Sequence, residues 1–250
     1  MNYTRRFMGS AYAEYQIIKG LTFRSTFGFV SGESNGRNFT LETRMGAKEL
    51  PNTTLSESHS WGYDWNWDQT LNYSKRIDKH DFNLMVTYSS EYSKNHNLSA
   101  SGQSIQTEVH DVLGKLESNF GIGGGESETS RISQLGRFTY SYAGKYILVA
   151  NVRRDGSSKF SEGNKWGTFP SASLAWNISE ESFMDGLKAS TQLSRMKLRG
   201  SFGVVGNDRP IGAYSYVASL SASNYSDGTA GLVGQTVSNL TKNPNLQWET

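Results

Sequence analysis

Apolar and polar side chains alternate over most of this chain, and this alternation constrains its fold more than any other feature. In residues 64–73, tryptophan, leucine and tyrosine alternate with aspartate, asparagine and threonine. Successive side chains of a strand point to opposite faces, so such a segment has one apolar and one polar face. The pattern therefore predicts an all-β, antiparallel chain. The predicted strands are residues 11–19, 21–30, 64–73, 82–88, 134–142, 145–153, 169–176 and 196–205.

The connections between these strands alternate between short and long. Short turns are predicted at Lys19-Gly20, at 76–79 and at Ala143-Gly144. Compact water-soluble domains rarely contain several long structureless loops, whereas outer-membrane barrels combine short periplasmic turns with long extracellular loops. The polar segments expected to be long loops are 31–60, 93–131, 154–168 and 206–243.

One connection, residues 177–195, breaks this alternation. It lies where a short turn would be expected, yet it is long and contains the sequence Ser179-Glu180-Glu181. Serine is a favoured N-cap residue, and acidic residues are favourable in the first turn of a helix. We therefore expect a short helical turn in this connection, with Ser179 as its cap.

Composition excludes several classes of protein. A formal charge of +2 over 250 residues gives no strong basic field for nucleic acid. The absence of cysteine excludes disulfides and thiolate metal sites. No apolar run approaches the roughly 18 residues of a membrane helix, and residues 1–8 lack the apolar core of a signal peptide. If the chain meets a membrane, it does so through strands.

Aromatic residues lie near the predicted strand ends, as in membrane barrels. An inner girdle is expected beside the Ala143-Gly144 turn, from Tyr140, Tyr142 and Tyr146. An outer girdle is expected where strands meet long loops, from Trp61, Trp166 and Phe169. Ordinary core aromatics of a soluble β-sandwich are the alternative, which periodicity alone does not exclude.

The strand count bears on the domain organisation. About nine strands are predicted, the last beginning near Leu246. An open sheet in lipid would leave two unpaired edges, and bacterial single-chain barrels have even strand numbers. We therefore expect residues 1–250 to be one partial barrel domain, without a plug domain, a signal peptide or the closing strands.

Several motifs occur in a specific order in the second half of the chain. They are Gly136-Arg-Phe-Thr-Tyr-Ser-Tyr142, Lys145-Tyr-Ile-Leu148, Arg154-Asp-Gly-Ser-Ser-Lys-Phe160, Trp166-Gly-Thr-Phe-Pro-Ser-Ala-Ser-Leu-Ala-Trp176, Ile178-Ser-Glu-Glu181, Lys197-Leu-Arg-Gly-Ser-Phe-Gly203, Gly206-Asn207 and Asn243-Pro-Asn-Leu-Gln-Trp-Glu249. In this order they resemble SusC/RagA-type TonB-linked outer-membrane transporters of Bacteroidetes. The resemblance is densest from Gly136 to Glu249 and looser over 61–92.

This resemblance implies an antiparallel transmembrane barrel of about 22 strands in the Gram-negative outer membrane. Such proteins import oligosaccharides or peptides, driven by TonB acting on a plug domain, with a SusD-like lipoprotein as a lid. The chain would then contribute barrel wall and extracellular loops. It would be no enzyme and would need no cofactor.

The motif residues are expected to be structural rather than ligand-binding. Asp155-Gly156 would form a turn, and Ser157 and Ser158 would bond backbone groups. Ligand contact by Asp155 or Lys159 is not expected. The motif residues are Asp155, Gly156, Ser157, Ser158, Phe160, Trp166, Phe169, Pro170, Ser171, Trp176, Asn243, Pro244 and Trp248.

Candidate ligand-facing residues are the aromatics of the long loop 206–243, namely Tyr214, Tyr216 and Tyr225. Aromatic rings there could stack on sugars or peptides. No catalytic constellation is present. His59, His80, His96 and His110 have no metal-ligand spacing. The alternative function is a soluble or surface-attached β-sandwich that binds carbohydrate.

Overall fold

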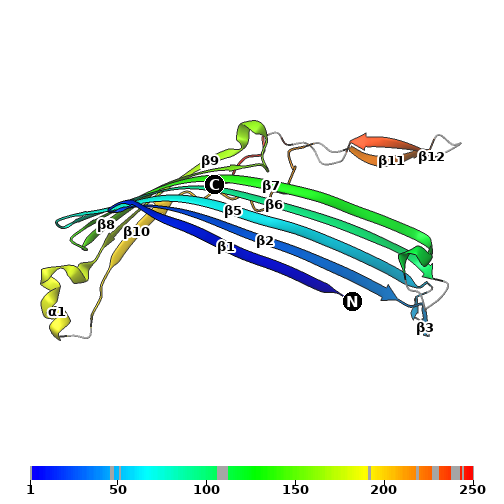
Figure 1. The fold of residues 1–250 in the computed structure, drawn as a ribbon, viewed down its shortest axis with the longest axis horizontal. Helices are drawn as coiled ribbons and strands as arrows, with labels where there is room; N and C mark the ends of the chain where they lie inside the picture. The colour runs from blue at the N-terminus through cyan, green and yellow to red at the C-terminus, as the bar shows by residue number, and fades with distance from the viewer. Residues whose placement is uncertain are drawn as a thin grey trace. The chain divides into compact units, whose positions relative to one another are not determined.

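The computed structural model describes residues 2–45, 48–50, 52–105, 112–190, 193–217, 220–226, 231–237, 243 and 245–249. Its main element is an eight-stranded sheet in which neighbours in the chain are hydrogen-bonded neighbours in the sheet (Figure 1). The strands, in sheet order, are β1 (Tyr3–Ile18), β2 (Leu21–Thr40), β5 (Thr54–Ile77), β6 (His80–Ile105), β7 (Leu116–Tyr142), β8 (Tyr146–Ser157), β9 (Trp166–Trp176) and β10 (Leu198–Gly203). The all-β prediction is confirmed.

The chain divides into two compact units. Unit 1 consists of 1–11, 27–66 and 91–129, and unit 2 consists of 12–26, 67–90 and 130–250. Strands β1, β2, β5, β6 and β7 have residues in both units, whereas β8, β9 and β10 belong to unit 2.

In unit 2 the register of β7 to β10 places apolar side chains opposite one another. One row across the strands is Tyr142, Tyr146, Trp176 and Leu198. Directly opposite residues of paired strands lie on the same face, so this row belongs to one apolar face of the sheet. Tyr142, Tyr146 and Leu198 of this row are exposed, at 37%, 47% and 63%, and so is Leu174, two residues along β9 on the same face, at 65%.

The opposite, polar face of the same strands carries a chain of hydrogen bonds. Arg137, Asn151, Ser171 and Gly203 form one row across β7 to β10. Arg137 donates to Asn151 at 2.8 Å, and Asn151 donates to Ser171 at 3.1 Å. The alternation read from the sequence therefore separates an apolar face from a polar one, as predicted.

All the predicted short turns are present, and all lie in unit 2. Gly20, between β1 and β2, has φ +87°, and a Cβ there would overlap the Ser74 carbonyl oxygen. Asp78 has φ 52° in the β5–β6 turn. Ala143 and Gly144 both have positive φ, as a tight hairpin turn between right-twisted strands requires.

Two of the predicted long loops are wrong over most of their length. Of residues 31–60, β2 takes up those to Thr40 and β5 begins at Thr54, with the small hairpin of β3 (Thr43–Met45) and β4 (Lys48–Leu50) between them. Of residues 93–131, β6 runs to Ile105 and β7 begins at Leu116, preceded by the 3₁₀ turn η1 (Leu113–Lys115). These stretches are polar on both faces, so they carry no apolar alternation, although their backbones pair as strands.

The other long connections agree better with expectation. Between β8 and β9 only 158–165 lie outside strands, with the 3₁₀ turn η2 (Glu162–Asn164) among them. Asp155 and Gly156 are therefore in β8 rather than in the expected turn. The segment after β10 contains the hairpin of β11 (Leu220–Ser226) and β12 (Gly231–Val237). A ninth strand near Leu246 is represented only by an isolated bridge between Asn207 and Glu249.

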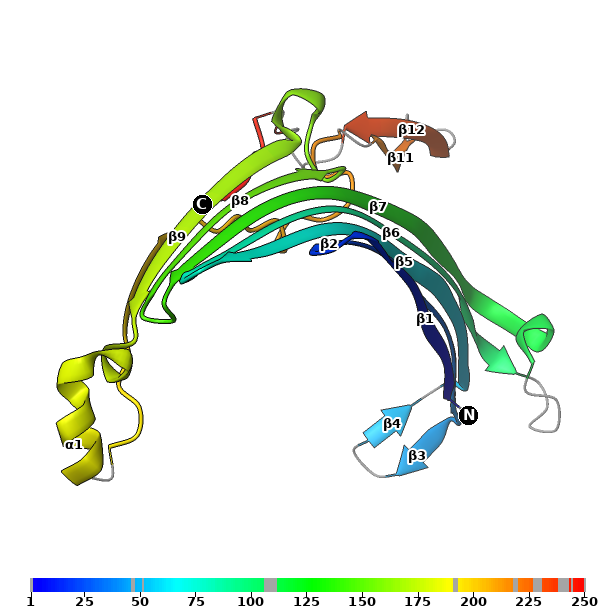
Figure 2. The same ribbon diagram turned by 60° about the vertical axis from the view of Figure 1, so that its left-hand side comes forward.

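The connection between β9 and β10 contains the expected helical turn. It is built from η3 (Ile178–Glu180), η4 (Ser182–Met184) and α1 (Asp185–Ser190), which lie beyond the ends of β9 and β10 (Figure 2). Ser179 is not its cap as predicted, because it lies inside η3 and is buried. Asn177 precedes η3 and fixes the connection to the β7–β8 turn instead, donating its side-chain amide to the Gly144 carbonyl at 2.5 Å.

The aromatic positions follow from which face each residue occupies. Tyr142 and Tyr146 lie on the apolar face beside the turn, as predicted for the inner girdle. Trp166 lies under the Arg154 guanidinium at 4.6 Å. Phe169 does not join an outer girdle as predicted, because it pairs with Arg153 on the polar face and is buried.

Unit 1 has its own aromatic cluster. Trp61 stacks on His96 with ring centroids 5.4 Å apart, and Trp65 stacks on Tyr92 at 5.9 Å. The predicted outer-girdle residue Trp61 thus pairs with a histidine of β6. Trp65 and Tyr92 belong to a connected group of rings on β1, β2, β5 and β6, whose other members are Phe7, Phe27, Phe29 and Tyr63.

Candidate functional site

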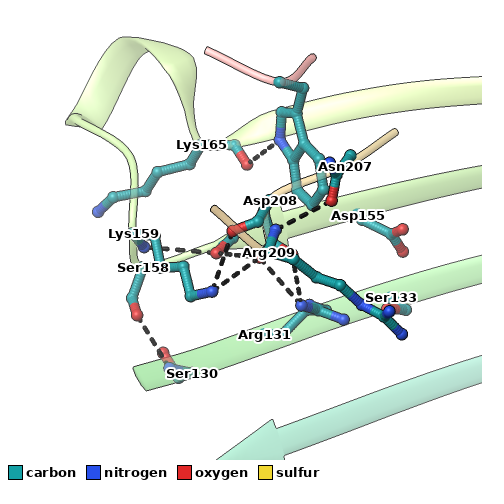
Figure 3. Close-up of polar contacts among 12 residues, drawn as sticks. Ser130, Arg131, Ser133, Asp155, Ser158, Lys159, Lys165, Asn207, Asp208 and Arg209 are labelled. Carbon is teal, nitrogen blue, oxygen red and sulfur yellow. Dashed lines mark hydrogen bonds and ion pairs between the residues drawn. The ribbon is translucent and has the colours of Figure 1, made fainter. Parts of the chain in front are cut away.

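A cavity of about 430 Å³ opens on the polar face of β7, β8 and β9 in unit 2. Side chains from these three strands line it together with Trp248 and the segment 204–209 that follows β10. We call it the polar-face cavity. Figure 3 shows the hydrogen bonds and ion pairs that join its strands to this segment.

Asp208 is the centre of the contacts. Its carboxylate accepts two hydrogen bonds from the Arg131 guanidinium, at 2.8 and 2.9 Å, and one from the Ser157 hydroxyl at 3.2 Å. Lys159 donates to its backbone carbonyl at 3.0 Å. Only 4% of Asp208 is exposed. A buried carboxylate requires such charge-assisted partners, so Asp208 fastens the segment after β10 to β7 and β8.

Asp155 plays a comparable role within the sheet. Both of its carboxylate oxygens accept from Arg153 Nε, at 2.9 and 2.7 Å. A second nitrogen of the same guanidinium donates to the Ser133 hydroxyl on β7 at 3.2 Å. Asp155 and Ser133 are both buried. The Asp155 side chain thus orients Arg153 on the wall of the cavity.

Two aromatic rings, those of Phe169 and Trp248, line one side of the cavity, and the ring of Phe160 packs behind them. Phe160 is completely buried, with its ring 5.1 Å from that of Trp248, and Phe169 lies 5.4 Å from the same ring. Trp248 donates its indole N–H to the Lys165 carbonyl at 3.0 Å. A Cβ on Gly206 would overlap the Phe169 ring, so glycine is required there for the backbone to approach this closely.

The cavity carries an excess of positive charge. Arg131, Arg137, Arg153 and Arg209 line it, against Asp155 and Asp208. Four arginines and two aspartates leave a formal excess of two positive charges. Arginine presents a planar fork of donors that suits carboxylate and phosphate groups. The arrangement is therefore suited to binding an anionic group, and it contains no nucleophile paired with a general base.

Several of the motif residues lie at or beside this cavity. Asp155, Phe169, Ser171 and Trp248 line it. Ser157 donates to Asp208, and Phe160 packs against Trp248. Ser158 bonds the β7 backbone through its hydroxyl, which accepts from Ser130 N at 2.9 Å. Pro244 lies outside the described residues. Trp176 lies away from the cavity, on the apolar face.

The four arginines that line the cavity and Asp208 were not predicted from the sequence as site residues. Asp208 directly follows the Gly206-Asn207 motif, and that adjacency was the only available signal. Arg131 and Asp208 are 77 residues apart. Strand alternation assigns Arg137 and Arg153 to the polar face, but does not tell which loop returns to meet them.

Neither Tyr214 nor Tyr216 is among the described residues that line the polar-face cavity. Tyr214 is half-exposed at 48% with φ 63°, and Tyr216 is partly buried. Tyr225 lies in β11, and its side chain is outside the described part of the structure. Their role in ligand contact stays a prediction.

Three of the four histidines lie in the described part of the chain, each against a polar or aromatic neighbour. His59 shares a hydrogen bond with Asn35 at 2.7 Å, His80 with Tyr140 at 2.8 Å, and His96 stacks on Trp61. His110 is outside the described residues. Among the residues that the structure describes, no cluster of histidine and carboxylate side chains could hold a metal ion. No helix within the described ranges is long and apolar enough to span a membrane.

Comparison with known proteins identifies relatives over almost the whole chain. No protein-family model matches it. It is 33% identical over 256 aligned residues to TonB-dependent receptor P3 of Formosa agariphila, covering 96% of this chain and 24% of that receptor. It is 32% identical over 216 residues to TonB-dependent receptor SusC of Bacteroides thetaiotaomicron, covering 79% of this chain and 21% of the receptor.

Solved structures give the same result for the fold. The chain matches a structure of the RagAB peptide transporter with a TM-score of 0.87 at 22% identity, covering 99% of this chain and 27% of that one. The RagAB peptide importer in an "open-open" state matches with a TM-score of 0.85. The chain thus spans about a quarter of the length of these relatives. Their names describe receptors and transporters, not enzymes.

Proposed function

We propose that this chain, whose sequence and fold match a segment of the SusC/RagA-type TonB-dependent receptors, forms barrel wall and extracellular strands of an outer-membrane importer. The apolar face of unit 2 contacts the lipid of the Gram-negative outer membrane, and the polar face lines the lumen. The short turns at Gly20, Asp78 and Gly144 face the periplasm. The wall itself does no chemistry, and the energised step belongs to a plug domain on which TonB acts.

The observation that carries this proposal is a single sheet layer whose apolar face is exposed. Leu174, Leu198 and Phe202 are 65%, 63% and 78% exposed in the structure. Such a face is favourable only against another apolar medium. Lipid provides that medium, and the polar opposite face with its cavity fits a water-filled lumen.

The substrate is a peptide or an oligosaccharide, and two observations favour a peptide. The matching solved structures are titled as a peptide transporter and importer. In addition, the polar-face cavity has an excess of arginine over aspartate, and every unmodified peptide carries a C-terminal carboxylate. The partner that closes the importer from outside is a SusD-like surface lipoprotein.

Uptake by cells tests this function. A strain lacking the full-length gene, supplied with fluorescent peptides or oligosaccharides of matched size, is expected to lose accumulation of peptides and to regain it on complementation. Arg209→Ala is expected to weaken peptide uptake several-fold more than Lys75→Ala, a control on the short-turn side. Loss of oligosaccharide uptake alone would replace the peptide assignment, and unchanged uptake of both would refute the importer.

The alternative, a soluble carbohydrate-binding β-sandwich, requires its aromatic faces to be buried between two layers. In the described residues of unit 2, only Phe160, Phe169 and Met184 are buried among apolar side chains. The exposed rows of β8 to β10 have no second sheet against them in unit 2, so this alternative is the weaker one.

A further inference from the structure

The connection between β9 and β10 differs from the other turn-side connections of unit 2. The other three are tight turns, whereas this one contains η3, η4 and α1 in succession (Figure 2). It is also firmly attached. Asn177 N donates to the Lys145 carbonyl at 2.7 Å, and Ser179 N donates to the Met196 carbonyl at 3.1 Å. We call residues 178–190 the turn-side helix segment.

Glu181 joins this segment to the apolar face of the sheet. Its carboxylate accepts from Lys145 Nζ at 2.7 Å, from the Tyr146 hydroxyl at 2.7 Å and from the Trp176 indole N–H at 3.2 Å. Tyr146 and Trp176 are the last residues of the apolar face of β8 and β9, and their rings stack 6.4 Å apart. The segment therefore begins at the edge of the face assigned to lipid, not at the lumen.

The helical stretch then exposes large apolar side chains on one side. Phe183 in η4 and Leu187 in α1 are 62% and 49% exposed. They lie four residues apart, about one helical turn, so their side chains leave the stretch on the same side. Met184, a quarter-turn away, is buried at 4% and packs inward. Asp185, two residues after Phe183, is on the opposite side and exposed. The stretch is thus amphipathic in its own right.

We propose that the turn-side helix segment lies in the headgroup region of the periplasmic leaflet and anchors this part of the barrel by inserting Phe183 and Leu187 among phospholipid chains. The inference rests on the proposed function, because it takes the apolar face of unit 2 to contact lipid. Continuity with that face identifies the occupant. Tyr146 and Trp176 mark the level where aromatic side chains favour the membrane interface, and the exposed side chains continue from there.

Charge and size fit the same occupant. Lys188 lies on the segment, where a lysine side chain can reach the phosphate groups of lipids. Helices of this type bury their apolar side about 5–10 Å into the boundary between headgroups and acyl chains. The stretch is too short to go deeper.

Site-directed spin labelling measures this depth. The full-length gene product, freed of any other cysteines, would carry a nitroxide at Phe183→Cys or Leu187→Cys, in vesicles of phosphatidylethanolamine and phosphatidylglycerol. Collisions with oxygen report lipid, and collisions with a water-soluble nickel chelate report water. Asp185→Cys is the control on the other side of the helix, and Leu174→Cys is the control on the wall. All four positions are exposed, so folding is preserved.

Labels at 183 and 187 are expected to read about 5–10 Å below the headgroup boundary, with the label at 185 in water and that at 174 in lipid. If 183 and 187 collide with nickel as often as 185 while 174 reads lipid, the anchor is refuted and the importer wall stands. Shielding of 183 and 187 from both reagents would mean that protein covers them, which also refutes the anchor. If 174 itself reads water, the proposed function fails and the anchor with it.

Discussion

Phe160 is the single side chain on which the loop between β8 and β9 depends most. It is fully buried and lies against Trp248, a residue from the far end of the chain. Replacing it with alanine removes a whole ring from a packed site. Phe160→Ala is therefore expected to lower the free energy of unfolding by about 3–5 kcal/mol.

Urea titration in detergent micelles, followed by tryptophan fluorescence, measures this loss. Phe120→Ala is the matched control, because Phe120 is 66% exposed, and it should change the free energy of unfolding by less than about 0.5 kcal/mol. Equal effects of the two substitutions would mean that Phe160 is not packed as described.

Asp208 is the second residue whose substitution should destabilise the fold, because it holds the segment after β10 against β7 and β8. Asp208→Asn keeps the shape of the side chain but places an amide against Arg131, so that charge-assisted hydrogen bonds are lost. The expected loss is about 1.5–3 kcal/mol, measured by the same titration. Glu162→Gln, at an exposed position of η2, serves as control. In a double-mutant cycle with Arg131→Met, purely additive losses would contradict a direct interaction.

For single residues, the sequence predicts which side chains are structural better than it predicts which side chains they contact. The order of the motifs singled out Asp155, Ser157, Phe160 and Trp248 as structural residues, and the structure places them together. It did not single out Arg131 or Asp208, since an ion pair between residues 77 apart leaves no pattern in either segment. The pairing depends on where the segment after β10 returns to the sheet.

At the scale of elements, the longest strands give a prediction about protection. Residues 93–104 of β6 look like a polar loop in the sequence but are paired in the structure. In hydrogen–deuterium exchange, their amides are expected to exchange as slowly as those of residues 82–92, because ladder hydrogen bonds must open first. Residues 161–165 between β8 and β9, which lie outside the strands, serve as the reference. Exchange of 93–104 at the rate of that reference would contradict the extended strand.

The turn-side helix segment gives a prediction about pH. Lys145 first, then Tyr146 and Trp176, hold the pKa of Glu181 down to about 2 by hydrogen bonding to its carboxylate. A carboxyl group with a lowered pKa stabilises the folded arrangement above its unfolded pKa, and this contribution is lost as pH falls through the folded value. Attachment of the segment should therefore be complete above about pH 4.5 and weaken progressively towards about pH 2.

The mobility of a spin label at Leu187→Cys, followed from pH 6 to 2 in the full-length protein, measures this transition. Asp185 is a further carboxyl group that acts electrostatically on Lys145, so Asp185→Asn is included to show that Glu181 carries the effect. Lys145→Met should raise the pKa of Glu181 and move the loss of attachment to higher pH. If the spin-labelled protein loses attachment at the same pH with and without Lys145→Met, the Lys145–Glu181 pair is excluded as the cause of the transition.

Elements are predictable from sequence where one face is apolar. Strands such as 134–142 and 196–205 were located because their apolar side chains fall on one parity. The outer parts of β2, β6 and β7 were taken for loops because both parities are polar there, although backbone pairing needs no apolar face. The prediction for Phe169 is wrong because an aromatic side chain does not by itself tell which face it occupies. Phe169 is one residue from Pro170, which is on the apolar face, so Phe169 is on the polar face.

At the scale of the whole molecule, the exposed apolar face predicts how the chain behaves outside a membrane. Produced alone, residues 1–250 are expected to aggregate in water and to stay dispersed only in detergent, because burial of that face is not available within the described sheet. Circular dichroism and analytical ultracentrifugation with and without detergent measure this. A folded, monomeric chain in plain buffer would favour the soluble β-sandwich.

The sheet order β1-β2-β5-β6-β7-β8-β9-β10 follows the order of the chain without a crossover, and this has an evolutionary consequence. Within the described sheet, the backbone of each strand pairs with the strands next to it in this order. A gene segment encoding one hairpin can therefore be duplicated, deleted or exchanged between relatives while the remaining wall keeps its pairing. Recombination of this kind must preserve parity, since a shift of one residue would exchange the two faces. Sequence differences between relatives should therefore fall into blocks that correspond to whole hairpins, and should be most frequent at the hairpin ends farthest from the short turns.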